Sequence, residues 1–149
     1  MKAIVLSVVL NIVFSGLSAA EVRNMSLADD EAKIREAHTQ YFQALGSGDM
    51  NLLAESFTFP SSFKGFLEDV IIATDKESLI ATYERLIAAA PNATRTEVSG
   101  LEVGYLRPGV YMLSMSYEQF GEDDAPIHKG QAIYFLKKVN DEFKLFAVF

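Results

Sequence analysis

Hydrophobic positions in the first half of the chain repeat at steps of three and four residues, which is the spacing of one helix face. The first such segment begins at Asp29 or Asp30, and the residues on its inward face are Ile34, Ala37, His38, Tyr41 and Leu45. Gly46 and Gly48 follow, and glycine readily takes the left-handed conformation that ends a helix. Asp49 then has the position of an N-cap, which predicts a second, short helix that points Leu52, Leu53 and Phe57 inward.

Residues 59–73 interrupt this periodicity. Pro60, two serines and Gly65 predict irregular structure, and a short β-like run occupies residues 70–73. Thr74 and Glu77 then have the spacing of a capping box, which predicts the start of a third helix. The inward residues of that helix would be Leu79, Ile80, Tyr83, Leu86, Ile87 and Ala90, and Pro91 follows its end.

From Thr94 onward the hydrophobic period changes to two, which is typical of strands. Four strands fit, over residues 97–106, 110–120, 127–139 and 142–149. A turn at residues 107–109, an acidic loop at 121–126 and a hairpin about Asn140 and Asp141 connect them. The pattern therefore predicts a single α+β domain of three N-terminal helices packed on an antiparallel sheet.

The first twenty residues have the features of a cleavable signal peptide. Lys2 precedes an apolar run over residues 3–17, and Ser18-Ala19-Ala20 is a small-residue cleavage site. Asn11 interrupts the run, which falls short of the roughly 20 apolar residues of a membrane span. We expect cleavage after Ala20, export to the periplasm or the medium, and no stable membrane anchor. The alternative is an uncleaved tethering helix. Residues 21–149 would form the domain.

Composition narrows the classes of function. The formal net charge is −7, and Lys2 is the one charged residue of the signal segment, so the mature domain carries −8. Such an acidic balance argues against nucleic-acid binding, which needs a basic face. The chain has no cysteine and only two histidines, 90 positions apart, so we expect no metal site. No phosphate loop or dinucleotide fingerprint occurs, and no cofactor is expected.

The order of elements resembles the nuclear transport factor 2-like superfamily, which includes SnoaL-like proteins and ketosteroid isomerase. The resemblance rests on a helix, a Gly48-Asp49 corner, a short helix, a capped third helix and long terminal strands, over residues 30–149. It implies a cystatin-like cone, in which a curved sheet wraps around the helices and the open end is often a pocket. Members include enzymes and non-catalytic binding modules, so the fold does not decide the function.

Ketosteroid isomerase itself is a poor match in its catalytic groups. Tyr41 has the spacing of the tyrosine that donates to the oxyanion in that enzyme. The stretch 58–65, where the aspartate base would lie, contains no carboxylate, and Ile133 occupies the position expected for the protonated aspartate. The resemblance therefore carries over one of three groups, which excludes that reaction.

The candidate site consists of His38, Tyr41, Phe63 and Tyr83. His38 and Tyr41 are one helical step apart, so both are expected to face the cone. In the leading hypothesis they are the polar contacts to a small apolar molecule, and Phe63 and Tyr83 are walls of its pocket. In a second hypothesis His38 acts as acid or base and Tyr41 as oxyanion donor of a cofactor-independent isomerase, hydratase or cyclase.

A third hypothesis is a non-catalytic dimeric interaction module, in which Phe59, Phe63 or Phe66 fills the cone. Bulky apolar side chains occur on both faces of the predicted strands, so a homodimer through the outer sheet face is expected. In the strand over residues 127–139, His128 shares one face with Gly130 and Tyr134, and Lys129 lies on the other. Alternation alone leaves open which of these faces lines the cone.

Overall fold

The computed structural model describes residues 19–66, 68–90 and 92–149, with side chains from residue 27 onward. Residues 1–18, which make up most of the expected signal peptide, lie outside that part of the chain, so export stays a prediction. Within the described ranges, no helix combines the length and hydrophobicity needed to cross a membrane.

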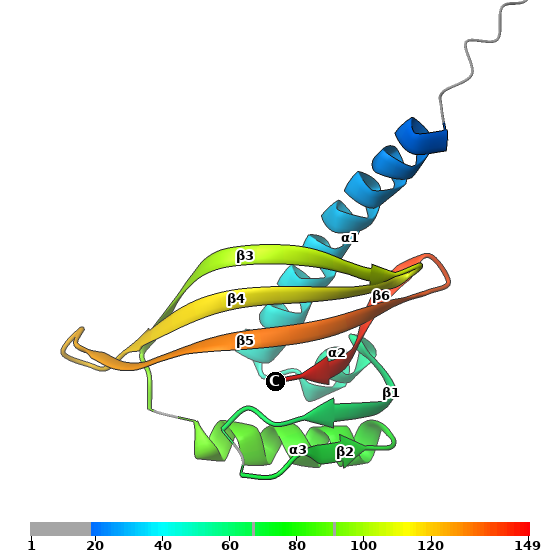
Figure 1. The fold of residues 1–149 in the computed structure, drawn as a ribbon. Coiled ribbons are helices and arrows are strands. Elements are labelled where there is room, and N and C mark those ends of the chain that lie inside the picture. Colours follow the sequence, from blue (N-terminus) through cyan, green and yellow to red (C-terminus); the bar gives the residue numbers. More distant parts are fainter. Residues whose placement is uncertain (1–18, 67, 91) are drawn as a thin grey trace, which may run out of the picture.

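The described residues form an α+β structure with a six-stranded curved sheet (Figure 1). The elements in chain order are α1 (Ala19–Ser47), α2 (Met50–Glu55), β1 (Phe57–Phe63), β2 (Ile71–Ala73), α3 (Lys76–Ala89), β3 (Arg95–Arg107), β4 (Val110–Phe120), β5 (Pro126–Val139) and β6 (Glu142–Val148). The strand order is β2-β1-β6-β5-β4-β3. Neighbouring strands are antiparallel except for β1 and β6, which are parallel.

The structure differs from the predicted fold at its first strand. Two of the helices are long, and α2, as predicted, is short, with six residues. The strand β2 coincides with the β-like run expected at residues 70–73, whereas β1 occupies residues that were predicted to be irregular because Pro60 lacks an N–H group for a strand ladder. In the structure, the parallel pairing with β6 is interrupted between Phe57 and Ser62, and this interruption contains Pro60.

The corner between α1 and α2 has the predicted construction. Gly48 takes a left-handed conformation with φ of 73°, and its N–H donates to the carbonyl of Leu45 at 3.2 Å. The Asp49 carboxylate then accepts hydrogen bonds from the N–H groups of Asn51 and Leu52. These contacts satisfy backbone groups that each helix end would otherwise leave unpaired. The hairpin turn is also confirmed, since Asn140 and Asp141 both have positive φ, as a two-residue type I′ turn requires.

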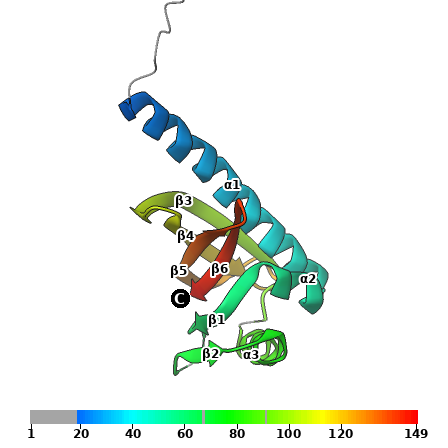
Figure 2. The same ribbon diagram turned by 90° about the vertical axis from the view of Figure 1, so that its right-hand side faces the viewer.

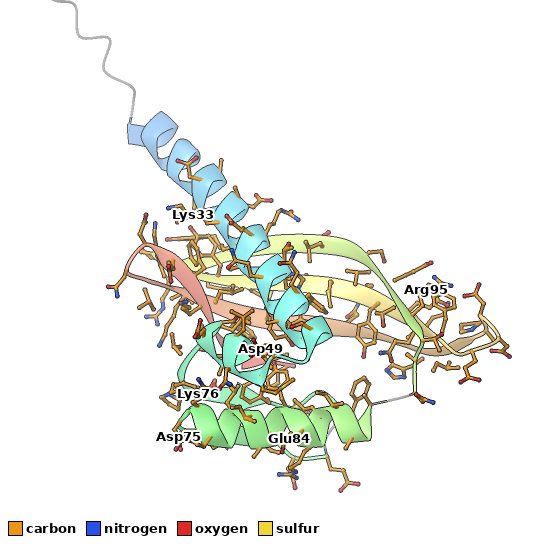
Figure 3. The ribbon with its side chains drawn as sticks, turned by 180° about the vertical axis from the view of Figure 1, so that it is seen from behind. Lys33, Asp49, Asp75, Lys76, Glu84 and Arg95 are labelled. Carbon is orange, nitrogen blue, oxygen red and sulfur yellow. The ribbon has the colours of Figure 1, made fainter. Side chains whose placement is uncertain are left out.

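The start of α3 is displaced by one residue from the prediction. Asp75, not Thr74, is the N-cap, and its carboxylate accepts from the N–H of Ser78 at 2.8 Å. The Ser78 hydroxyl accepts in return from the N–H of Asp75 at 3.1 Å. Figure 3 shows Asp75 at the beginning of this helix and Glu84 on its side away from the sheet. The box therefore pairs Asp75 with Ser78, where the sequence pattern paired Thr74 with Glu77.

Both long helices lie on the concave side of the sheet, and no described helix covers its convex side (Figure 2). The buried core joins α1, α3 and the concave face, and its largest members include Ile34, Leu53, Phe63, Leu79, Leu113, Leu136 and Leu145. On β5 the buried residues are Tyr134 and Leu136. Alternation therefore places His128 and Gly130 on the concave face as well.

A buried carboxylate fixes the N-terminal part of α1 to the strands β4 and β5. Asp30 is 8% exposed, and its two oxygens accept hydrogen bonds from the Tyr111 hydroxyl at 2.7 Å and the Lys138 ammonium at 2.9 Å. Lys138 also pairs with Asp141, at 3.1 Å. Burial acts to raise the pKa of Asp30, but the hydrogen bonds from Lys138 and Tyr111 and the charge of Lys138 outweigh it, so the pKa is lowered.

We predict that Asp30→Asn lowers the free energy of unfolding at pH 7 by ~2 kcal/mol, because it removes a charge-assisted hydrogen bond from a buried pair. The contribution of Asp30 is present above its unfolded pKa, so it is lost as the pH falls through the lowered folded value. Urea unfolding at pH 7 and pH 3 measures both effects. Glu31→Gln is the matched control, since the exposed Glu31–Arg35 pair should contribute less than ~0.5 kcal/mol. Equal losses in the two variants would contradict the assignment.

Candidate functional site

A cavity of about 430 Å³ opens between α1, α3 and the concave face of the sheet. Figure 1 shows that β3, β4 and β5 run on past the C-terminal end of α1, and the cavity is lined from this part of the sheet by Thr96, Tyr117 and Gln119. Most of its wall is aliphatic or aromatic, with Phe42 and Leu45 from α1, Leu86 and Ile87 from α3, and Met115 from β4. A concavity of this size and character is typical of a site for a small apolar molecule.

Two tyrosine hydroxyl groups meet in this wall. The Tyr83 hydroxyl donates to the Tyr41 hydroxyl at 3.0 Å, and both residues line the cavity although their side chains are almost fully buried. Burial raises the pKa of Tyr41 to about 12 against the opposing effect of the hydrogen bond from Tyr83, and burial also raises the pKa of Tyr83. Both groups are therefore neutral at pH 7. Because the Tyr41 oxygen accepts the hydrogen bond from Tyr83, the O–H group of Tyr41 can donate a hydrogen bond to a ligand.

His38 lies behind this wall and is not one of the residues that line the cavity. It is 6% exposed, and its ring packs edge-on against Phe42 and Tyr134, at centroid distances of 4.8 and 4.9 Å. Burial, with a smaller contribution from the charge of Arg35, lowers the pKa of His38 to about 4. His38 and Tyr41 thus share the predicted helix face, but Tyr41 reaches the cavity and His38 remains a neutral side chain inside the core.

Phe63 is also placed differently from its predicted position in the wall. It is fully buried, with its ring centroid 5.4 Å from that of Phe57 and 5.5 Å from that of Tyr83. Phe63 therefore supports Tyr83 from behind. Phe66, which is 38% exposed, lines the opening instead, and the cavity stays open beside it. The sequence missed this because β1 was expected to be irregular, which left the directions of its side chains undefined.

A second pair of polar side chains lies near the opening. The Tyr117 hydroxyl is 3.2 Å from Nε2 of His128, and the His128 ring packs edge-on against Phe66 at 5.4 Å. Tyr117 lines the cavity, together with Gln119. Strand alternation grouped His128 with Tyr134, and the buried position of Tyr134 now shows that this face is the concave one. Among the described residues, no cluster of three or more histidine, aspartate or glutamate side chains could hold a metal ion.

We predict that His38 makes the protein less stable as the pH falls from about 6.5 to about 4. A histidine held neutral in the fold but free to bind a proton when unfolded loses up to ~3 kcal/mol over such a difference in pKa. His38→Leu should remove this dependence, so the unfolding free energies of variant and wild type should diverge below pH 6.5. Urea unfolding at pH 7 and pH 4.5 tests this. Parallel curves for the two proteins would contradict the lowered pKa.

Comparison with known proteins gives the fold. No protein-family model and no curated protein matches the chain, but solved structures do. A protein of unknown function with a cystatin-like fold from Nostoc punctiforme is 14% identical, with a TM-score of 0.64 over 89% of this chain and 90% of that one. A nuclear transport factor 2-like protein of unknown function from Shewanella oneidensis is 11% identical, with a TM-score of 0.57 over 80% and 96%.

A ketosteroid isomerase-like protein from Erwinia carotovora atroseptica is 14% identical, with a TM-score of 0.60 over 78% of this chain and 91% of that one. Identities this low establish a shared architecture and leave the function to be argued from the site. The chain therefore has the nuclear transport factor 2-like, cystatin-like fold that the order of its elements predicted.

Proposed function

We propose that this protein binds a small, largely apolar molecule in the cavity between α1, α3 and the sheet, and that Tyr41 donates a hydrogen bond to an oxygen atom of that molecule. The observation that carries the proposal is the hydrogen bond from Tyr83 to Tyr41 in an otherwise mainly apolar wall. Because of this bond, the Tyr41 hydroxyl group remains free to donate a hydrogen bond, and its orientation is set by the buried Tyr83.

The energetics of the wall favour such a contact. Hydrogen bonds are stronger in surroundings of low polarity than in water, and a donor there gains from a partner. Tyr41 is also held in place on several sides, because its ring lies within 6.3 Å of the rings of Tyr83, Tyr134 and Phe57. A preorganised donor costs little ordering on binding. The site is suited to an apolar ligand with a carbonyl or hydroxyl oxygen at one end.

Binding is a better account of this geometry than the isomerase, hydratase or cyclase hypothesis. That hypothesis used His38 as acid or base, but His38 lies behind the cavity wall with its pKa lowered to about 4. The ketosteroid isomerase reaction is also not supported, since the stretch 58–65, where its aspartate base would lie, has no carboxylate. Ile133 alternates with the buried Tyr134 and so belongs to the convex face.

Export and assembly belong to the same proposal. The signal segment over residues 1–20 would deliver the binder to the periplasm or the medium. The homodimer would form through the convex face, to which Phe135 belongs by alternation with Tyr134. The ring centroids of Phe146 and Phe149 lie 6.0 and 6.2 Å from that of Phe135, so the three side chains form an aromatic cluster. Phe149 is 39% exposed and also reaches the edge of the cavity, and a second copy would remove this apolar surface from water.

The Tyr41 contact can be tested with para-phenylphenol, an apolar probe with one hydroxyl group. Isothermal titration calorimetry should show binding to the wild type and about tenfold weaker binding to Tyr41→Phe, since one hydrogen bond is worth ~1 kcal/mol or somewhat more. Tyr105→Phe is the matched control, because Tyr105 is 42% exposed and does not line the cavity. Equal affinities for all three proteins, or no binding to the wild type, would contradict the proposal.

The homodimer is tested by light scattering on the mature protein at micromolar concentration. We expect twice the chain mass for the wild type and one chain mass for Phe146→Glu, which places a charge in the aromatic cluster. Leu52→Glu is the control, because Leu52 is an exposed apolar residue on α2 that is not part of the aromatic cluster. A wild type that is monomeric would rule out this assembly.

A further inference from the structure

The cavity has a second polar group near its opening, apart from the tyrosine pair of α1 and α3. The hydroxyl of Tyr117 and Nε2 of His128 lie 3.2 Å apart, and Gln119, the cross-strand partner of His128, lines the same region. Oε1 of Gln119 is buried without a hydrogen-bond partner among the described residues. This oxygen is therefore an available hydrogen-bond acceptor beside the Tyr117–His128 pair.

Gly130 is needed for this arrangement. A Cβ atom at Gly130 would lie 2.6 Å from the Tyr117 hydroxyl oxygen and 2.7 Å from the ring carbon that carries it. Gly130 is not one of the glycines with positive φ, so the backbone does not require a glycine at this position. The requirement comes from Tyr117, whose ring lies over β5 and thereby reaches His128. A glycine at position 130 thus leaves the space that the Tyr117–His128 pair occupies.

The two polar groups lie at different places along a wall that is mainly apolar but includes Tyr134. Tyr134, whose ring is 5.7 Å from that of Tyr41, marks the inner end on β5. Gly130, under Tyr117, is four residues away along the same strand, a distance of about 13 Å in extended chain. Met115 and Ala132 line the cavity between them. A ligand long enough to touch Tyr41 and the Tyr117–His128 pair would lie along this apolar wall.

The surroundings of the pair favour a neutral ligand group. Glu118 and Lys129, the charged neighbours of Tyr117 and His128 in the sequence, pair with each other at 2.7 Å on the convex face. No aspartate, glutamate, lysine or arginine side chain lines the cavity as the described residues form it. A hydroxyl group suits the pair best, because it can donate and accept, and so matches Tyr117 and His128 whichever ring nitrogen of His128 carries the proton.

We propose that Tyr117 and His128 form a second ligand-binding subsite, so that the molecule bound is a neutral apolar compound with an oxygen-bearing group at each end, such as a diol or a hydroxy-ketone. This inference rests on the proposed function, in which Tyr41 binds the first oxygen. Tyr117 makes the second contact, His128 orients the Tyr117 hydroxyl, and Phe66 supports the His128 ring from the opening.

Two matched probes test the subsite: para-phenylphenol, with one hydroxyl group, and para,para′-biphenol, which adds a second hydroxyl at the opposite end of the same skeleton. The ratio of their dissociation constants, measured by calorimetry, isolates the second contact. In the wild type we expect para,para′-biphenol to bind about tenfold more tightly. In Tyr117→Phe and in Gly130→Ala the ratio should fall to about one.

The outcomes separate the two proposals. If para-phenylphenol binds but the second hydroxyl adds nothing in the wild type, or its advantage persists in Tyr117→Phe, the subsite is wrong and the proposed function stands. If neither probe binds the wild type, both are wrong. Gly130→Ala is assessed by circular dichroism first, and if it does not fold, the wild type and Tyr117→Phe decide the question. Tyr117→Phe keeps the ring over Gly130 and is therefore expected to fold.

Discussion

The structure depends on the packing of α1 into the concave face of the sheet. Ile34 and Ala44 are fully buried there, and Asp30 fixes the N-terminal part of the contact through Tyr111 and Lys138. Burial of apolar surface supplies most of the stabilisation, and the Asp30 contacts add direction, since a carboxylate that accepts two hydrogen bonds at a buried position tolerates little displacement. The position of the cavity then follows from the length of α1. α1 ends at Ser47, while β3, β4 and β5 continue beyond it (Figure 1).

This uncovered end of the sheet is closed in part by α3 and by Phe66, and what remains is an apolar space with polar atoms at defined points. The convergence of Tyr41, from α1, and Tyr83, from α3, places a directed hydroxyl group at the inner end. The contact of Tyr117, from β4, with His128, from β5, places another near the opening. Each pair joins different elements, so the positions of these hydroxyl groups are set by the fold.

The sequence predicted features that depend on local chemistry. The Gly48-Asp49 corner, the Asn140-Asp141 hairpin and the four long strands were all predicted, because a left-handed glycine, a capping carboxylate and a period of two act over a few residues. The prediction was wrong for β1, because its pairing with β6 joins segments about 85 positions apart. The N-cap of α3 was predicted one residue too early. Long-range pairing has no local signature when a proline interrupts the strand.

The candidate site was predictable to a similar degree. The helical repeat placed His38 and Tyr41 on one face, but a face is wide enough to serve both a core and a cavity. Whether each side chain reaches the cavity depends on where Phe42 and Tyr134 pack, and no pattern in the chain records that. His128 was grouped correctly with Tyr134, yet its contact with Tyr117 depends on strand register, which the sequence alone does not give. Tertiary packing therefore decides the site.

The most direct measurement of the central claim is a crystal structure of the mature protein soaked with para-phenylphenol. The account predicts electron density for the probe between α1, α3 and the concave face, with its hydroxyl oxygen within hydrogen-bonding distance of the Tyr41 hydroxyl and its rings against Met115 and Leu86. Density for the probe on the convex face alone, or bound with its hydroxyl directed away from Tyr41, would contradict it.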